Sequence, residues 1–273
     1  MSDITLSDAT RSALFTVLRT TGLADKTSER LSTGKRVNSV NDDAPAYFQA
    51  QALSSRAGDL LGLKDGIGQS ASALGGALGG VDAIADIVSQ LKGIALAAKG
   101  GTVAERGAAA AQFDALRGQI DSLAADASFG GINLISFNPD NLTTPFNETG
   151  TSSLTISGIA SDSSSLGIGT AAATYNNFIT DADIDNAIGF VNQGVITLGA
   201  TALTLGSNVA QLNNRLDFTR RLVSELQTGA DKLISADLNE EAAKLLSLQA
   251  TRELGIVGLN IANQSQQAVL QLF

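Results

Sequence analysis

The sequence contains no cysteine, no histidine and no tryptophan among its 273 residues. Without cysteine there are no disulfides and no thiol nucleophile. Without histidine there are no imidazole metal ligands and no histidine general base. We therefore predict that the protein is not an enzyme and that it uses no metal or other cofactor.

Basic residues are also few. The chain has 18 Lys and Arg against 27 Asp and Glu, for a net charge of −9, which argues against nucleic acid as a partner. Residues 118–214 contain eight acids and no Lys or Arg, whereas the segments on either side are nearly balanced. An acidic, Ser/Thr/Gly-rich insert therefore separates two ends of a different character.

Signals for membrane targeting are weak. The first residues carry acids and no apolar core, which excludes a cleaved secretory signal peptide of the usual kind. Residues 254–273 are uncharged but rich in Asn and Gln, so a membrane span is not expected there. We predict no membrane insertion, and we find no long apolar hairpin in the sequence.

Apolar residues recur at alternating spacings of three and four over two long stretches, from Leu53 to Ala98 and from Ile184 to Leu233. This spacing keeps one apolar seam along a helix. Fifty residues at ~1.5 Å each give a rod of roughly 75 Å. A third helix fits Ala109 to Ala127, after a break at Gly100 and Gly101. We predict a mainly α protein, an elongated antiparallel helical bundle or coiled coil.

The stretch between Ala127 and Ile184 has short runs of alternating polar and apolar residues, such as Ser153 to Ser157, that predict small strands. We therefore expect a small β-hairpin insert. Glycines are frequent in the first long helix, and we interpret them as small residues that allow close helix packing. They are Gly62, Gly66, Gly68, Gly75, Gly76, Gly79 and Gly80.

The two ends of the chain show the same spacing, from Leu14 to Leu31 and from Leu238 to Phe273, but polar residues interrupt both seams. Such helices gain most of their stability from packing, so we expect them to be poorly ordered in a free monomer. The predicted domains are terminal helices 1–35 and 239–273 that pair with each other, a linker 36–43, a rod 44–128 with 184–233, and an acidic surface insert 129–183.

The segment 29–47, ERLSTGKRVNSVNDDAPAY, contains fragments that resemble a phosphate-binding loop and a cation site. A phosphate-binding loop is excluded, because Glu29 stands at its first Gly position and Arg36 at its Ser/Thr position. We predict instead that Gly34 ends one helix and that Asp43 caps the next, with Pro45 in its first turn. This interpretation is favoured over a cation site at Asn41-Asp42-Asp43.

Glu29–Ser39 followed by Asp42–Ala44 resembles the N-terminal block of bacterial flagellins. Phe129–Leu134 resembles the family's turn into a hairpin, and residues 248–273 are similar to its C-terminal helix. The resemblance covers both ends, about two thirds of the chain. It implies an extracellular filament subunit for swimming motility, with the terminal helices as an inner tube and the long helices as an outer tube.

The resemblance also implies partners. They are other copies of the chain, sister flagellins, a flagellar export chaperone, and the hook-junction and cap proteins, with export by the flagellar type III route. Gln90–Ala95 departs from the family's innate-receptor segment, so weak receptor recognition is expected. A hook–filament junction protein is the close alternative, and a secreted type III translocator is a more distant one.

Two groups of residues are candidates for self-assembly. Charges around the predicted linker are expected to contact neighbouring subunits. Polar residues in the C-terminal seam are expected to set the register between subunits, by analogy with polar residues that specify coiled-coil pairing. The first group is Arg30, Lys35, Arg36, Asp42 and Asp43, and the second is Gln249, Arg252, Asn263 and Gln266, with the apolar Leu270 and Phe273.

Overall fold

The computed structural model describes residues 8–270, without the side chains of Ala9, Gln266 and residues 268–270. Its long helices are α1 (Asp8–Thr33), α2 (Ala44–Ala98), α3 (Val103–Asp126), α5 (Asp181–Ile234) and α6 (Leu238–Leu270). The prediction of a mainly α protein with long antiparallel helices and a small β-hairpin insert is confirmed. Contacts divide the chain into two units, Met1–Ala57 with Ser224–Phe273, and Gly58–Val223. Each unit is described separately, and the predicted domain boundaries remain predictions.

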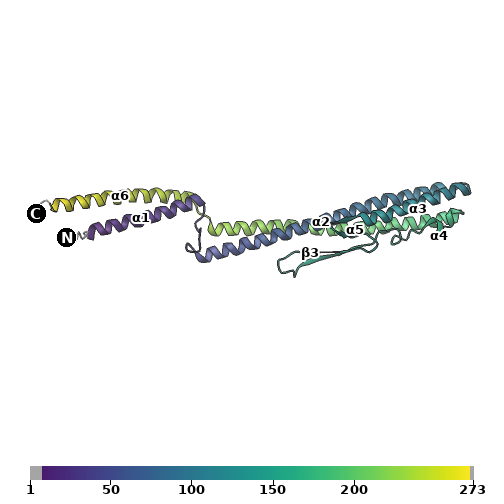
Figure 1. Cartoon of the computed structure of the whole chain (residues 1–273), viewed down its shortest axis with the longest axis horizontal. Helices are drawn as coiled ribbons and strands as arrows, with labels where there is room; N and C mark the ends of the chain where they lie inside the picture. The colour runs from purple at the N-terminus through teal and green to yellow at the C-terminus, as the bar shows by residue number, and fades with distance from the viewer. Residues whose placement is uncertain (1–7, 271–273) are drawn as a thin grey trace. The chain divides into compact units, whose positions relative to one another are not determined.

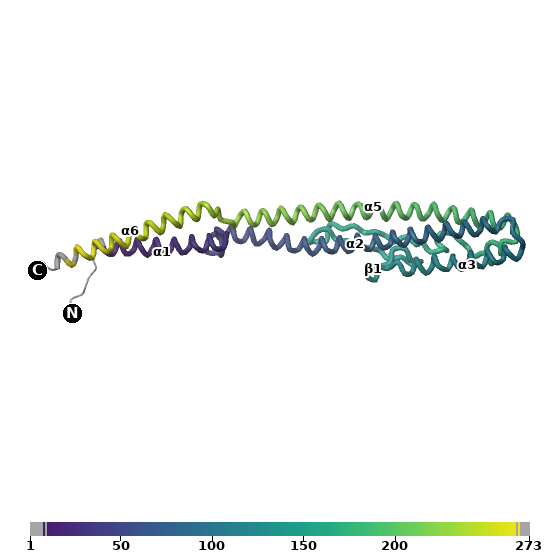
Figure 2. Tube along the Cα trace, turned by 90° about the horizontal axis from the view of Figure 1, so that it is seen from above, coloured from purple at the N-terminus to yellow at the C-terminus, as the bar shows by residue number. Residues whose placement is uncertain are grey.

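The unit 58–223 has a continuous apolar core made by α2, α3 and α5, which run side by side (Figures 1 and 2). The spacing predicted this core well. From Ile67 to Ala98, every residue of the predicted α2 seam is buried, and most of the predicted α5 seam is buried or half-buried. Phe113 and Ile120 of α3 complete the core.

The insert folds into two small antiparallel hairpins. Strands β1 (Ser128–Phe129) and β2 (Ile132–Asn133) form the first, and β3 (Asn141–Pro145) and β4 (Ser153–Ser157) form the second. The strand predicted at residues 153–157 is therefore confirmed. Beneath the second hairpin, the buried Thr144 hydroxyl donates to Ser70 Oγ of α2 at 2.7 Å. This bond explains the polar Ser70 in an otherwise apolar seam.

The interpretation of the α2 glycines is wrong for most of them. A Cβ atom at Gly80 would lie 2.7 Å from Ile135 Cδ1 and 2.9 Å from the Cβ of Ala127, the C-cap of α3, so this glycine does allow a close approach to the end of a helix. A Cβ at Gly76 would reach Phe129 at an ordinary 3.9 Å. The remaining five positions have no neighbouring atom within 4 Å among the described residues: Gly62, Gly66, Gly68, Gly75 and Gly79.

Two helices bear on the expectation of no membrane insertion, which remains a prediction. Helices α2 and α5 each contain an 18-residue window with a mean hydropathy of 1.4, and each is long enough to cross a membrane by length and composition. Only 39% of the α2 window and 28% of the α5 window is buried within the chain. Buried core helices pass the same test, and both helices contribute to the core of the unit 58–223.

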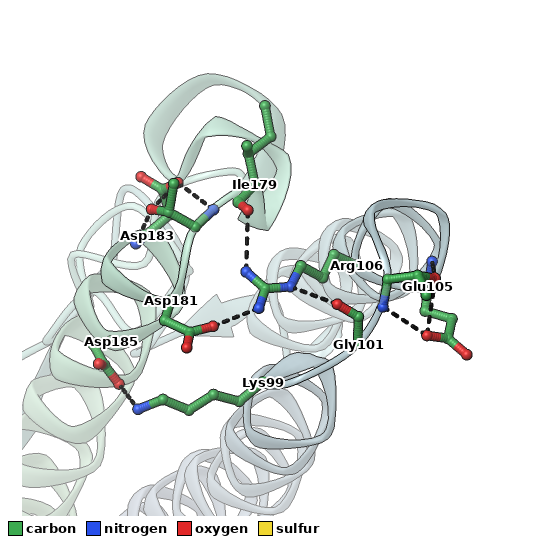
Figure 3. Close-up of polar contacts among 10 residues, drawn as sticks. Lys99, Gly101, Glu105, Arg106, Ile179, Asp181, Asp183 and Asp185 are labelled. Atoms are coloured by element: carbon green, nitrogen blue, oxygen red, sulfur yellow. Dashed lines mark hydrogen bonds and ion pairs between the residues drawn. The ribbon is translucent and has the colours of Figure 1, made fainter.

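Charged residues close the end of this unit where the α2–α3 turn meets the start of α5 (Figure 3). Arg106 donates to the carbonyl oxygens of Gly101 and Ile179 and pairs with Asp181, while Lys99 pairs with Asp185. Asp181 and Asp185, two acids in the first turns of α5, are therefore neutralised within the chain.

Capping fixes the two helix starts beside this cluster. Glu105 forms a capping box with Thr102, and hydrogen bonds from the Thr102 backbone and hydroxyl lower the Glu105 pKa. Asp183 accepts hydrogen bonds from the Thr180 hydroxyl and from the Thr180 N–H. These bonds, the hydroxyl bond more than the N–H bond, lower the Asp183 pKa.

The turn before α5 has an unusual backbone. Residues 176–178 have positive φ angles although none of them is a glycine. Phe178 is buried against Phe113, with their ring centroids 5.4 Å apart.

Candidate assembly surfaces

The segment 34–43 forms a tight joint with the chain that enters α6. Helix α1 ends at Thr33, and Gly34 follows with φ +68°, the left-handed conformation of a helix C-terminus. Lys35 then pairs with Ser235 in an antiparallel bridge, and the Arg36 and Val37 N–H groups both donate to the Ile234 carbonyl. The predicted helix end at Gly34 is confirmed.

The acids of this joint organise its backbone. Asp43 accepts a hydrogen bond from the Ala46 N–H at 3.1 Å, which confirms it as the N-cap of α2. Asp42 accepts bonds from the Asn38 and Ser39 N–H groups and pairs with Lys26 Nζ at 2.8 Å. The Lys26 bond, followed by those backbone bonds, holds the Asp42 pKa far below its usual range. Among residues 8–270, no group of three acids is placed to hold a metal ion.

Two of the three basic residues of the joint also have partners within the chain. Arg30 pairs with the buried Glu241 of α6 at 3.1 Å. Arg36 lies 3.4 Å from Asp43 and donates to the Leu233 carbonyl. Within the described chain, the Lys35 side chain makes no ion pair. Contacts of these residues with neighbouring subunits therefore remain a prediction, and Arg30, Arg36, Asp42 and Asp43 also hold the joint itself.

Helices α1 and α6 run antiparallel and in close contact (Figures 1 and 2). Their facing residues are mostly small. Thr10, Thr20, Ala24 and Thr27 are the buried residues of α1. A Cβ at Gly255 of α6 would lie 2.8 Å from Val17 Cγ2, so a larger residue there would force Val17 or the helix to shift.

The large apolar side chains of this helix pair face outward instead. Phe15 is 74% exposed and Leu254 is 72% exposed. Sequence reasoning missed these residues, because it assumed that the largest apolar side chains mark the inner seam. The outward apolar set, here called the outer apolar face, is Leu14, Phe15, Leu18, Leu23, Leu246, Leu254, Ile256, Val257 and Ile261.

The predicted seam of α6 is displaced by one residue at alternate positions. Gln249 and Asn263 are exposed, whereas Leu248 and Ala262 are half-buried. Arg252 is half-buried, as a seam residue should be, and its Nε has no hydrogen-bond partner. The side chains of Gln266 and Leu270, and the whole of Phe273, lie outside the described residues. The register role of these residues remains a prediction.

Comparison with known proteins gives a consistent result. A family model described as "Bacterial flagellin N-terminal helical region" matches residues 8–138. Flagellin FljK of Caulobacter vibrioides is 31% identical over 247 residues, which cover 90% of this chain and 89% of FljK. FljO of the same bacterium is 30% identical over 96% of this chain and 94% of its own length.

A flagellin of Brucella melitensis is 26% identical over 100% of this chain and 99% of its own length. A crystal structure of Bacillus cereus flagellin has 18% identity and a TM-score of 0.48 over 56% of this chain, a similarity too low to add to the argument. The relatives span the long helices, the insert and the terminal helices alike. The chain belongs to the bacterial flagellin family and is a structural subunit of the extracellular flagellar filament.

Proposed function

We propose that the outer apolar face of α1 and α6 is the surface through which copies of this chain polymerise. The observation that carries this proposal is the arrangement of side chains on the helix pair. The fully buried residues are mostly small, and many large apolar residues face outward. Full burial of one Leu or Phe contributes about 1.5–3 kcal/mol. Covering this face by other copies would therefore contribute substantially to assembly.

The outward placement of large apolar side chains also explains how such a helix pair can be added to the end of an existing filament. Alone, the pair fully buries mainly Thr and Ala, while larger residues such as Val17 and Leu248 are only half-buried, so its helices are only marginally stable. At the filament end, the apolar face becomes buried and the helices become ordered at the same time. Assembly is therefore coupled to folding of the terminal helices.

Truncation tests the proposal. Removal of residues 1–35, or of residues 239–273, should leave a soluble and helical monomer that forms no filaments after warming in salt, as seen by electron microscopy. The untruncated chain should form long filaments by itself, which a protein restricted to the hook junction would not do. Filaments from either truncated chain would refute the proposal.

Further parts of the proposal concern partners and export. The chain is exported by the flagellar type III route without a cleaved signal, and an export chaperone covers α6 before export. The exposed Leu246, Leu254 and Ile261 support this, because an apolar face needs cover before assembly. Hook-junction and cap proteins, as well as sister flagellins, contact the same terminal helices. The chain performs no catalysis, consistent with its lack of His and Cys.

Weak recognition by the innate receptor for flagellins is proposed from Gln90–Ala95. In this segment Gln90 and Gly93 are exposed and uncharged, while Leu91 and Ala95 belong to the core. A receptor that reads charge on this surface therefore finds only Lys92. A cell-based receptor assay should give a signal well below that of a strongly recognised flagellin, and an equal signal would overturn this part.

A further inference from the structure

Arg215 of α5 lies against two aromatic rings. Its guanidinium carbon is 4.9 Å from the centroid of Phe146, at the end of β3, and 5.1 Å from that of Phe218 on α5. A guanidinium over aromatic rings is held in place by cation–π attraction. Its N–H groups lie in its plane, in a fork that matches a carboxylate.

Those N–H groups have no acceptor within the part of the chain that the structure describes. Arg215 Nε is buried without a hydrogen-bond partner, and no acid pairs with the side chain. The nearest acid in sequence, Asp217, pairs with Arg220. A buried donor without a partner costs about 1–3 kcal/mol, so the arrangement requires an explanation.

The guanidinium forms part of the wall of an open pocket of about 340 Å³. Phe146 and Leu154 of the second hairpin form one side, and Gln211, Asn214 and Phe218 of α5 form the other. No acid lines the pocket, and the two side-chain amides are further hydrogen-bond donors. Positive charge, free donors and the lack of an acid favour an anion.

We propose that this pocket binds a carboxylate, and that the carboxylate is an Asp or Glu side chain of a second copy of the chain. The inference rests on the proposed function, because a filament places copies in contact. Each copy has nine more acids than bases. Exposed acids such as Asp82 and Asp86 form no ion pair among residues 8–270.

A pair between Arg215 and such an acid would offset the repulsion between acidic subunits. Charge-assisted hydrogen bonds to arginine are about twice as strong as neutral ones, and the fork geometry adds specificity. The aromatic contacts keep the side chain in one place before the partner arrives, so little further ordering is needed. The pocket would thereby fix one contact between subunits.

A purely internal role is the alternative, in which Arg215 only holds the hairpin onto α5. Zero-length cross-linking separates the two roles. Arg215→Lys places an amine at the pocket, and a carbodiimide joins an amine to a carboxylate in contact. Filaments are grown from equal amounts of ¹⁴N- and ¹⁵N-labelled variant, and cross-linked peptides are identified by mass spectrometry.

We expect peptides that join the introduced lysine to an Asp or Glu of the other isotope, in filaments and not in monomers. The control, Arg221→Lys, alters an exposed arginine of the same helix whose Nε bonds only the Asp217 carbonyl, and it should give no such product. Products within one copy only, or none from position 215, would overturn the proposal. If wild-type chain forms no filaments, the proposed function fails and not the pocket.

A second measurement covers the case in which the lysine variant does not assemble. Arg215→Gln should raise the critical concentration for filament growth at low salt about tenfold, while Arg221→Gln changes it less than twofold. Circular dichroism and the thermal midpoint of the monomer check that both variants fold. Equal critical concentrations for the two variants would contradict the proposal.

Discussion

The two units of this chain use their apolar residues in opposite ways. In the unit 58–223, large apolar side chains form an internal core in which Ile67, Leu91 and Phe113 are fully buried, although others such as Ile196 and Leu203 are exposed. In the terminal helices, Thr and Ala face inward, and Phe15 and Leu254 face solvent. The first unit therefore has its own core, whereas the second presents an apolar surface that we propose other copies cover. The comparison suggests a division of roles, in which the unit 58–223 provides the stability of the monomer and the terminal helices provide the surface for assembly.

The largest expected effect lies in the core of the unit 58–223. Phe113→Ala removes a fully buried ring that packs edge-on against Tyr175 and Phe178. It should lower the free energy of unfolding by about 3–5 kcal/mol, measured by urea denaturation of the monomer. Phe15→Ala, on the exposed side of α1, should change it by less than about 0.5 kcal/mol. Similar decreases in the free energy of unfolding for both variants would contradict the proposed difference between the two units.

The next largest effect is expected on polymerisation and not on the stability of the monomer. Leu254→Ser removes an exposed apolar side chain of α6 and should leave monomer unfolding unchanged. It should raise the critical concentration for polymerisation by about 10- to 100-fold, which corresponds to losing the burial of one Leu. Ser247→Ala, an exposed polar position on the same helix, serves as the control and should have little effect. Unchanged polymerisation of the Leu254 variant would count against the outer apolar face.

Acid should act on the joint through Asp42. Its folded pKa is depressed by Lys26 and by the Ser39 and Asn38 N–H groups, so its contribution is present above the unfolded pKa of about 3.9. That contribution is lost as pH falls from there toward the folded pKa. In the filament, where α1 and its Lys26 are ordered, Asp42→Asn should therefore lower the thermal midpoint of disassembly at neutral pH, and the gap from wild type should narrow as pH falls below about 4. A gap that does not depend on pH would contradict this assignment.

The smallest effect concerns the left-handed turn before α5. Asn177 has φ 51° and is exposed, so Asn177→Gly relieves a conformation that costs about 1 kcal/mol and should stabilise the monomer by up to that amount. Asn186→Gly, in the regular part of α5, should instead destabilise it by a similar amount. Thermal unfolding of both variants gives the comparison, and a loss of stability for both would mean that the turn carries no such strain.

The sequence predicted the core of the unit 58–223 because its large apolar residues repeat at helical spacing with few exceptions. The same rule failed by one residue in α1 and α6, since Thr20, Thr27 and Gly255 give no hydrophobic signal although they form the contact. The helix stop at Gly34 and the cap at Asp43 were predictable because each follows from local backbone geometry.

Tertiary contacts account for what the sequence could not predict. Arg215 meets Phe146 only because the second hairpin folds back along α5, and no spacing in the sequence encodes that contact. The partners of Arg30 and Asp42 likewise depend on how the chain turns at the joint. The positive φ of Phe178 runs against the preference of a bulky residue and is held by its buried ring.

The central claim is that the terminal helices become stable only when other copies cover them. Amide hydrogen exchange, followed by mass spectrometry on monomer and on filament, tests it most directly. We predict that residues 14–31 and 238–262 exchange rapidly in the monomer and slowly in the filament, while residues 84–95 exchange slowly in both. Equally slow exchange of the terminal helices in the free monomer would contradict the account.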